Sequence, residues 1–324
     1  MALGQSHDMS ALACMDQSDF NVDNVPVRSF GGSRLRFAFN LALAARRSTR
    51  IIYDFAGTAR AHQILKLHNR PHAVWAHGFE VWDTPRPDYL KALARADLVL
   101  VNSAYNLERA AGALKGAKLV RVCQLATQQD DGPAPLGQRD APPVVLLLGR
   151  IDKLLAKGHD ILISIWPQVV SAVPDARLVL AGGGDAVDYV RGLASASPVA
   201  KSIDVTGFVP DPDIERMWAS ATIFAMPAFA EGFGLVYIEA MRRGIPVIAS
   251  REDAGQEVNV DGVTGFNVSR KSPDQIAETI IGLLRDRDLC QRLGAQGHSR
   301  WHKHYRFSSF ENRLLAATED FLAS

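Results

Sequence analysis

The chain has 324 residues, of which 47% are hydrophobic and 22% charged, and its formal net charge is +1. This composition excludes fibrous and globally disordered proteins, and the length predicts two domains at about 150 residues each. The balanced charge gives no general argument for nucleic-acid binding, and the three scattered cysteines form no disulfide framework.

The first part of the chain predicts a polar tail, disordered in part, followed by a compact α/β domain. Residues 1–23 are polar and rich in small side chains. Short apolar runs at residues 50–54, 73–76, 98–102 and 118–122 predict strands, and periodic segments at 33–47, 58–69 and 104–114 predict helices between them. Such alternation favours a parallel sheet, so we expect an N-terminal domain over residues 24–127.

Residues 128–143, QQDDGPAPLGQRDAPP, predict a linker because Pro, Gly and Asp replace apolar residues. A second α/β domain is expected over residues 144–306, with strands at 144–149, 176–181, 202–206, 222–226 and 246–249. Three helices at residues 273–285, 289–305 and 308–322 end the chain. No apolar run reaches the roughly 20 residues of a membrane span, so a cytoplasmic protein is expected.

A glycine-bearing segment, PAFAEGFGLVYIEAMRRGIP, follows the predicted strand at residues 222–226. Glu231 lies in its loop, and Glu239 lies on a helix expected to begin near Gly234. Ligands of open parallel sheets bind beyond the carboxyl ends of the strands, and free N–H groups at a helix start favour a phosphate. The two carboxylates suit hydroxyl groups, because an ionised carboxylate accepts charge-assisted hydrogen bonds. An acidic helix start that only stabilises the helix is the alternative.

A cationic segment, VVLLLGRIDKLLAKGHD, contains the predicted strand at residues 144–149. Arg150 follows that strand, and Lys157 and Gly158 open a helix expected over residues 157–173. Arginine makes bidentate contacts with phosphate and lysine supplies a point charge. Cations after one strand and carboxylates after another predict a pocket for an anion joined to a polyol, with solvated surface cations as the alternative.

These motifs resemble, in this order, those of the retaining glycosyltransferases of family 4, which have the GT-B fold. The resemblance covers residues 144–268 and includes VTGFVPDPDIERMWASA and PVIAS…EVNVDGVTGF besides the two segments above. It implies an α/β protein with two Rossmann-like domains facing a cleft. It also implies transfer of a hexose from a GDP- or UDP-linked sugar to an acceptor hydroxyl, with no cofactor and no obligatory metal. The last residues, 307–324, would form a helix that packs back on the N-terminal domain.

The resemblance implies a role for each matching residue. Arg150 and Lys157 would bind the donor diphosphate and stabilise the leaving group, although the interval between them is one residue longer than the commonest family spacing. Glu239 would hold the ribose hydroxyls and Glu231 those of the transferred sugar. The remaining contacts would come from Gly232, Phe233 and Gly234 to the sugar, from Leu235 and Val236 to the phosphates, and from Phe208 and Val209 to the base. Gly183, after the strand at residues 176–181, would line the donor side; a plain turn with Asp185 as helix N-cap is the alternative.

The first half carries shorter matches. Gly31 and Gly32 resemble the family's glycine loop near the donor diphosphate, with a simple turn as the alternative. His77 resembles a catalytic-site histidine that would donate a hydrogen bond and offer its backbone carbonyl, and a structural histidine is the alternative. Ser103 matches a family serine, but a helix N-cap explains it equally well. The interval from Gly32 to His77 is short for the family, which implies a shortened acceptor domain.

Basic residues gather in this half, where the segment from Arg28 to Arg70 has nine Lys or Arg residues and one Asp. An anionic membrane surface and a saccharide or lipid-linked acceptor are therefore expected partners, with cations that only solvate helix faces as the alternative. His298 and His302 lie four residues apart, but no carboxylate or cysteine is spaced to complete a metal site. We expect no metal there.

We therefore predict a retaining hexosyltransferase of polysaccharide biosynthesis, cytoplasmic and peripheral at the inner face of a membrane. Its predicted catalytic residues are Glu231, His77, Arg150 and Lys157. Two alternatives stay open: a nucleotide-sugar epimerase on the same fold, and a catalytically weak donor-binding subunit.

Overall fold

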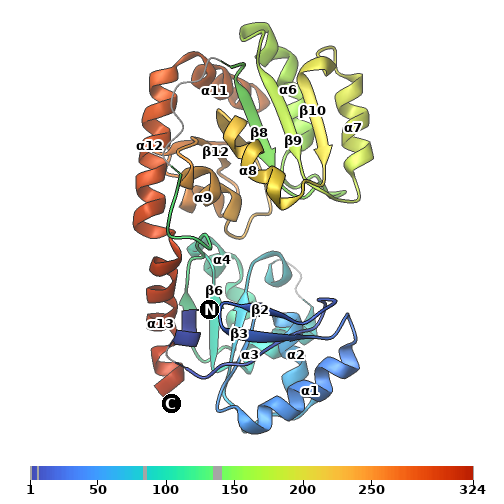
Figure 1. The fold of residues 1–324 in the computed structure, drawn as a ribbon, viewed down its shortest axis with the longest axis vertical. Helices are drawn as coiled ribbons and strands as arrows, with labels where there is room; N and C mark the ends of the chain where they lie inside the picture. The colour runs from blue at the N-terminus through green and yellow to red at the C-terminus, as the bar shows by residue number, and fades with distance from the viewer. Residues whose placement is uncertain (1, 6, 83–85, 134–140, 324) are drawn as a thin grey trace. The chain divides into compact units, whose positions relative to one another are not determined.

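The computed structural model describes residues 2–5, 7–82, 86–133 and 141–323, which form two compact α/β units (Figure 1). Unit 1 comprises Met1–Gln124 and Ser308–Ser324, and unit 2 comprises Leu125–Phe307. The expected linker at residues 128–143 includes residues 134–140, which lie outside the described residues. Its described part contains no helix or strand.

Unit 2 is built on a six-stranded parallel sheet in the order β10-β9-β8-β11-β12-β13. The strands are β8 (Val144–Leu148), β9 (Arg177–Ala181), β10 (Ile203–Gly207), β11 (Ile223–Met226), β12 (Val247–Ser250) and β13 (Gly265–Val268). The chain adds β9 and β10 on one side of β8 and then returns to place β11 on the other side. The strand order therefore switches between β8 and β11, which is where open parallel sheets bind their ligands.

Helices cover the sheet of unit 2 and bury its strands. They are α6 (His159–Ala172), α7 (Val187–Ala196), α8 (Asp211–Ser220), α9 (Leu235–Arg242), α10 (Gly255–Val258), α11 (Pro273–Arg285) and α12 (Arg287–His304), with a short 3₁₀ helix, η3 (Ala200–Ser202). Helix α6 packs against α7 and α11, and α9 packs against α10 and α12. Because both faces of the sheet are covered, central strands such as β8 are apolar throughout, which is why they could be predicted.

The main sheet of unit 1 has four parallel strands in the order β4-β5-β6-β7. They are β4 (Ile51–Tyr53), β5 (His72–Ala76), β6 (Leu98–Val101) and β7 (Val120–Val122). The helices are α1 (Arg34–Arg47), α2 (Ala56–Ile64), η2 (Phe79–Val81), α3 (Pro87–Ala94), α4 (Ala104–Arg109), α5 (Ala111–Leu114) and α13 (Phe307–Ala323). Helix α13 joins this unit through Phe310, whose ring stacks on Trp75 at 6.4 Å, and Arg313, which donates to the Gln124 carbonyl at 3.0 Å.

The expectation of a tail over residues 1–23 is wrong for three segments, two strands and a 3₁₀ helix. A separate three-stranded sheet joins β1 (Ala11–Ala13), β3 (Val25–Ser29) and β2 (Phe20–Val22), with β1 parallel and β2 antiparallel to β3. A 3₁₀ helix, η1 (Ala2–Gln5), precedes it. Only the central strand β3 buries apolar side chains, Val25 and Val27, so the two outer strands had no apolar alternation to reveal them.

Candidate active site

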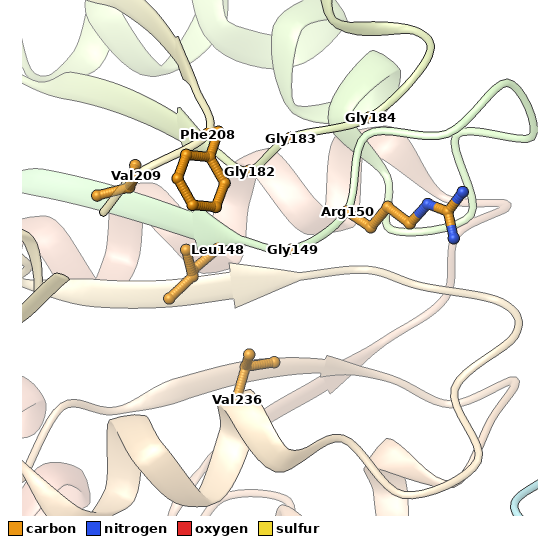
Figure 2. A pocket seen from close by; sticks show the side chains of 9 residues that line it. All are labelled: Leu148, Gly149, Arg150, Gly182, Gly183, Gly184, Phe208, Val209 and Val236. Atoms are coloured by element: carbon orange, nitrogen blue, oxygen red, sulfur yellow. The ribbon is translucent and has the colours of Figure 1, made fainter. Parts of the chain in front are cut away.

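A pocket of about 490 Å³ opens at the carboxyl ends of β8, β9 and β10 (Figure 2). It is lined by Leu148, Gly149, Arg150, Gly182, Gly183, Gly184, Phe208, Val209 and Val236. Five of the residues predicted to contact a donor thus meet in one pocket of unit 2. These are Arg150, Gly183, Phe208, Val209 and Val236.

The floor of the pocket is backbone, because glycines allow the turns after β8 and β9 to touch. A Cβ atom on Gly182 would lie 1.9 Å from the Gly149 carbonyl oxygen, and one on Gly184 would lie 2.0 Å from that of Ile151. The Ile151 N–H donates to the Gly183 carbonyl at 3.1 Å, which fastens the two turns together. The alternative in which Asp185 caps the next helix is wrong, since α7 begins after Ala186 and no side chain caps it.

The two ends of the pocket differ in chemistry. Phe208 and Val209 lie at one end and Arg150 extends from the other, with the glycine turns between them (Figure 2). The Phe208 ring is 78% exposed, and among the described residues no group pairs with the Arg150 guanidinium. An exposed ring offers a face for stacking and an unpaired guanidinium offers a contact for phosphate. The pocket therefore suits a planar base joined to a diphosphate.

Lys157 and Glu231 form an ion pair across the switch in strand order, between the loops after β8 and β11. Their side chains are 19% and 18% exposed. The longer Arg150–Lys157 interval is folded by two left-handed residues, Leu155 (φ 48°) and Gly158 (φ 90°), and the Gly158 N–H donates to the Leu155 carbonyl at 3.0 Å. The structure thus brings the predicted phosphate cation and the predicted sugar carboxylate together.

The loop that carries Glu231 leads into α9, whose N-cap is Gly234 (φ 89°). A Cβ atom on Gly234 would lie 2.3 Å from the Tyr237 ring, so only glycine fits at this bend. The first N–H groups of the helix, including those of Leu235 and Val236, have no partner four residues earlier, and Val236 lines the pocket. Phe233 is 2% exposed and its ring packs edge-on against Tyr305 at 6.0 Å, so its side chain is not available to a ligand. Gly232 is buried.

Glu239 lies on α9, and in the described part of the chain no hydrogen bond or ion pair involves its carboxylate. Burial raises the pKa of Glu239, and the nearby Arg243 guanidinium opposes that rise. A half-buried carboxyl group without a protein partner is suited to accept hydrogen bonds from a ligand.

In unit 1, His77 follows β5 and is held by its neighbours. Its backbone N–H donates to Glu80 at 2.6 Å, and its carbonyl accepts from the Asn102 amide at 3.0 Å. Its Nε2 lies 2.7 Å from the Asp54 carbonyl, which requires a proton on Nε2. The donor and the carbonyl predicted for His77 are therefore both engaged, and among the described residues no group pairs with its Nδ1.

The other predicted residues of unit 1 have structural partners. The Gly31 and Gly32 N–H groups donate at 2.8 Å to the carbonyls of Asp16 and Cys14, so this loop is closed on the N-terminal sheet. Ser103 is the N-cap of α4 and accepts the Asn106 N–H at 3.0 Å, as the N-cap alternative predicted.

The described residues offer neither a cluster of metal ligands nor a helix that could span a membrane. In that part of the chain no three His, Cys, Asp or Glu side chains gather as metal ligands would, His298 and His302 included. None of its helices has both the length and the apolar character needed to span a bilayer.

Comparisons with known proteins identify the family. The sequence profile of the family Glycosyl transferases group 1 matches residues 128–300, just over half of the chain. The chain is a group 1 glycosyltransferase. It is 31% identical over 269 residues to a GDP-mannose-dependent alpha-(1-6)-phosphatidylinositol monomannoside mannosyltransferase of Mycobacterium tuberculosis, covering 76% of this chain and 68% of the relative. A monoacylated-acceptor counterpart from Corynebacterium glutamicum is 31% identical over 281 residues, covering 80% and 71%.

Solved structures show the same GT-B fold at lower identity. Sucrose-phosphate synthase from Thermosynechococcus elongatus superposes with a TM-score of 0.83 and 20% identity, covering 99% of this chain and 91% of that one. Anabaena HepE in complex with UDP and glucose gives 0.76 and 19%, covering 91% and 86%. The predicted fold class, two Rossmann-like domains of GT-B type, is confirmed.

Three residues of the glycosyltransferase that support the site were missed by the sequence analysis. Asn102 and Glu80 fix His77, and Asp253 contacts Glu231 from the turn after β12. Asn102 directly follows the buried strand β6, and Glu80 and Asp253 lie a few residues after the ends of β5 and β12. Position at a carboxyl strand end was the signal that could have found them.

Proposed function

We propose that this glycosyltransferase moves mannose from GDP-mannose to a hydroxyl of a lipid-linked acceptor of the phosphatidylinositol mannoside class. The observation that carries the proposal is the similarity, over three quarters or more of the chain, to relatives named for this donor and this acceptor class. The pocket of unit 2 supports this proposal, because Phe208 lies at one end, Arg150 at the other, and the glycine turns lie between them.

The donor is assigned to the pocket group by group. Guanine would lie against Phe208 and Val209, and the ribose hydroxyls would meet the unpaired carboxylate of Glu239. The diphosphate would lie between Arg150, Lys157 and the start of α9, where the helix dipole favours an anion. The mannose hydroxyls would meet Glu231, with the backbone of Gly232, Phe233 and Gly234 beside them.

The reaction proposed is substitution with retention, since an α-linked donor gives the α-linked products for which the relatives are named. The acceptor oxygen bonds to the anomeric carbon from the side that the leaving phosphate occupies. The bond to the phosphate oxygen breaks, and that oxygen takes the proton of the acceptor hydroxyl. Arg150 and Lys157 stabilise the charge that develops on the diphosphate, so we propose that no metal is obligatory. The role of His77 stays a prediction.

For the acceptor, we propose that α1 lies on an anionic membrane surface. Phe37 and Leu41 on one face of α1 are buried, whereas Leu35 and Phe39 on another face are 86% and 65% exposed. Leu43 continues the exposed apolar stripe at the same spacing of four residues. The arginines beside it, exposed as well, are Arg36, Arg46 and Arg47. An apolar stripe bordered by cations is typical of helices that lie in a membrane interface, and such binding would keep a cytoplasmic enzyme at the inner face.

The test is a transfer assay with the full chain. Radiolabelled GDP-mannose, UDP-glucose and UDP-N-acetylglucosamine are each incubated with protein and vesicles that contain phosphatidylinositol monomannoside. We expect label from GDP-mannose in the lipid phase, unaffected by EDTA. Label that moves only from a UDP sugar would contradict the donor assignment. Conversion of the donor to an epimer would favour the epimerase, which no comparison supports, and tight binding without transfer would favour the donor-binding subunit.

A further inference from the structure

A buried carboxyl group lies directly behind the predicted sugar-binding loop. Asp253 follows β12 and is fully buried. Its Oδ2 accepts the Glu231 N–H at 3.3 Å and its Oδ1 accepts the Gly255 N–H at 2.9 Å. The next residue, Ala254, donates its N–H to the Glu231 carbonyl at 3.1 Å. The turn at residues 253–254 therefore holds Glu231 by both of its backbone polar groups.

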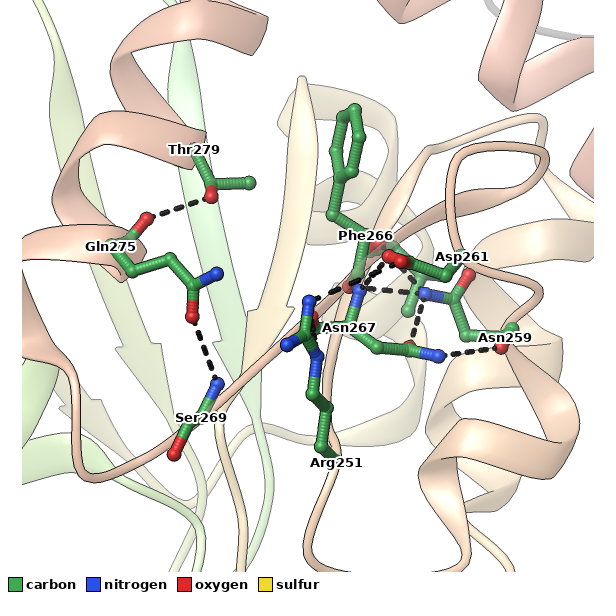
Figure 3. Close-up of polar contacts among 9 residues, drawn as sticks. Arg251, Asn259, Asp261, Phe266, Asn267, Ser269, Gln275 and Thr279 are labelled. Carbon is green, nitrogen blue, oxygen red and sulfur yellow. Dashed lines mark hydrogen bonds and ion pairs between the residues drawn. The ribbon is translucent and has the colours of Figure 1, made fainter.

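The turn that holds Glu231 is itself anchored to β13 (Figure 3). Arg251 donates to the Asn267 carbonyl at 2.7 Å, and the Asn259 amide donates to the Asn267 side chain at 2.9 Å and to the Phe266 carbonyl at 3.1 Å. These contacts fix the chain on both sides of Asp253. A displacement of Glu231 would then require either a broken contact to Asp253 or a distortion of this network.

Packing of the Tyr237 ring also supports the loop that carries Glu231. The Tyr237 ring lies between two glycines, since a Cβ atom on Gly234 would be 2.3 Å and one on Gly255 2.8 Å from it. The Tyr237 hydroxyl donates to the Met226 carbonyl at 2.8 Å, so the ring cannot turn away. The backbone of Glu231 is thus held by Asp253, Ala254 and the packing of Tyr237. Its side chain points to Lys157.

We propose that Asp253 is a positioning residue for recognition of the transferred sugar: it fixes the backbone of Glu231 so that the Glu231 carboxylate meets the sugar hydroxyls. The inference rests on the proposed role of Glu231. Asp253 does not touch the donor, because both of its oxygens face backbone N–H groups and none of its surface is exposed.

The electrostatics of Asp253 agree with a functional position. Burial raises the pKa of Asp253 to about 7, the Glu231 carboxylate adds to the rise, and the Gly255 and Glu231 N–H groups and Lys157 oppose it. Of the groups on the neighbouring helix, the Tyr237 hydroxyl also faces this charge, and its own pKa is raised. Buried acids that are costly to ionise concentrate at functional sites, where their contacts outweigh their effect on stability.

The test compares two nucleotides on Asp253→Asn, which keeps the shape of the side chain but turns one of its two acceptors into a donor. Dissociation constants for GDP and GDP-mannose are measured by calorimetry with the full chain at pH 8. We expect the ratio of the GDP-mannose constant to the GDP constant to rise about tenfold, as for one lost hydrogen bond to a charged group, while the GDP constant stays within about twofold. Asp253→Ala, smaller and uncharged, should show the same rise and serves if the asparagine variant does not fold.

Glu252→Gln is the matched control. It removes the same charge one residue away from Asp253, but the Glu252 carboxylate accepts hydrogen bonds from Ser250 and Ser269. It should leave the ratio unchanged. In a Glu231→Gln background, Asp253→Asn should raise the ratio no further, since both act through Glu231. An unchanged ratio in folded Asp253→Asn, or an equal loss of GDP binding, would overturn the inference alone. Wild-type protein that binds neither nucleotide would overturn the proposed function and the inference with it.

Discussion

Lys157 and Glu231, 74 residues apart in the sequence, are each other's counterion in a partly buried part of unit 2. A donor that needs Lys157 for its phosphates and Glu231 for its sugar must separate this pair. The ion pair keeps both charges satisfied until then. Under the proposed placement of the donor, the energy of separating the pair would be offset by contacts that only a complete nucleotide sugar makes. A nucleotide without a sugar would compete with Glu231 for Lys157 but would offer the Glu231 carboxylate no hydroxyl group in return.

The first prediction follows from this competition. Glu231→Gln should bind GDP as tightly as the wild type or more tightly, because Lys157 is released, yet transfer should fall about 10- to 100-fold. Lys157→Met should instead weaken GDP binding about tenfold. Calorimetry and the lipid transfer assay measure the two effects. Equal losses of GDP binding in both variants would show that Glu231 contacts the nucleotide itself.

A second prediction concerns the exposed ring at the aromatic end of the pocket. Phe208→Ala should weaken GDP binding about 3- to 10-fold, the range of an aromatic stacking contact, and should leave the melting temperature unchanged because the ring is exposed. Tyr189→Ala, which removes another exposed ring from α7 outside the pocket, is the control. If both variants bind GDP equally well, the base does not lie at Phe208.

The third prediction is a dependence of stability on pH. Folding raises the pKa of Asp253 from 3.8 to about 7, so between these values the folded state binds more protons than the unfolded state. The free energy of unfolding of unit 2 should therefore fall as the pH rises through this window, by up to about 4 kcal/mol from this group. Asp253→Asn should remove that fall.

Hydrogen exchange of β12 at pH 5.5 and pH 8, corrected for intrinsic rates, measures this dependence. Burial raises the pKa of Glu252, but hydrogen bonds from Ser269 and Ser250 outweigh it and hold that pKa low. The stability that Glu252 contributes is already complete at pH 5.5, so Glu252→Gln should leave the pH dependence of the wild type in place. A wild-type profile that is flat between the two pH values would refute a raised pKa at Asp253.

A fourth prediction concerns two stacked histidines in unit 1. The ring centroids of His62 and His72 lie 3.7 Å apart. Burial, and after it the charge of His62, lowers the pKa of His72 to about 4. The unfolded state binds more protons between pH 4 and 6.5, so unit 1 should lose up to about 3 kcal/mol as the pH falls through that window. His72→Phe should reduce the loss, measured by exchange of β5, whereas the exposed His68→Asn should not.

The fifth prediction tests the apolar stripe of α1. Serine at both Leu35 and Phe39 should weaken binding to vesicles with anionic phospholipid by at least about tenfold, since about 1.5–3 kcal/mol accompanies full burial of one such side chain. Transfer to a short water-soluble mannoside should stay unchanged. Tyr189→Ser is the control from unit 2. Equal binding of all three proteins to vesicles would exclude α1 as the contact.

The central strands of unit 2 could be predicted because burial on both faces leaves a continuous apolar run. Strand β13 was missed for the opposite reason: its sequence GFNV carries Asn267, whose polarity is satisfied by Asn259 and not by solvent. The helix expected to reach residue 69 ends at Ile64, because Lys66 adopts a left-handed conformation (φ 53°). Nothing in the sequence predicted that conformation.

The candidate site divides in the same way. The sequence could indicate that Arg150, Lys157 and Glu231 gather at one edge of the sheet, because each follows a buried parallel strand. Their roles stay predictions. Asp253 also lies beyond the end of a buried strand, but its contact with a backbone N–H group 22 residues away could not be read from the sequence. The partners of Gly31 and Gly32 were hidden as well, since the sheet that accepts their N–H groups is made of short polar strands.

Under the proposed placement of the donor, the glycine turn after β9 also limits how this enzyme could change its donor. With 1.9 Å and 2.0 Å left for a Cβ atom at Gly182 and Gly184, these positions cannot acquire side chains that read a different base. If the base lies where we propose, variation in nucleotide preference is expected in the loop of Phe208 and Val209, which lines the pocket and carries the exposed Phe208 side chain. A library aimed at a uridine donor should randomise that loop and leave the glycines alone.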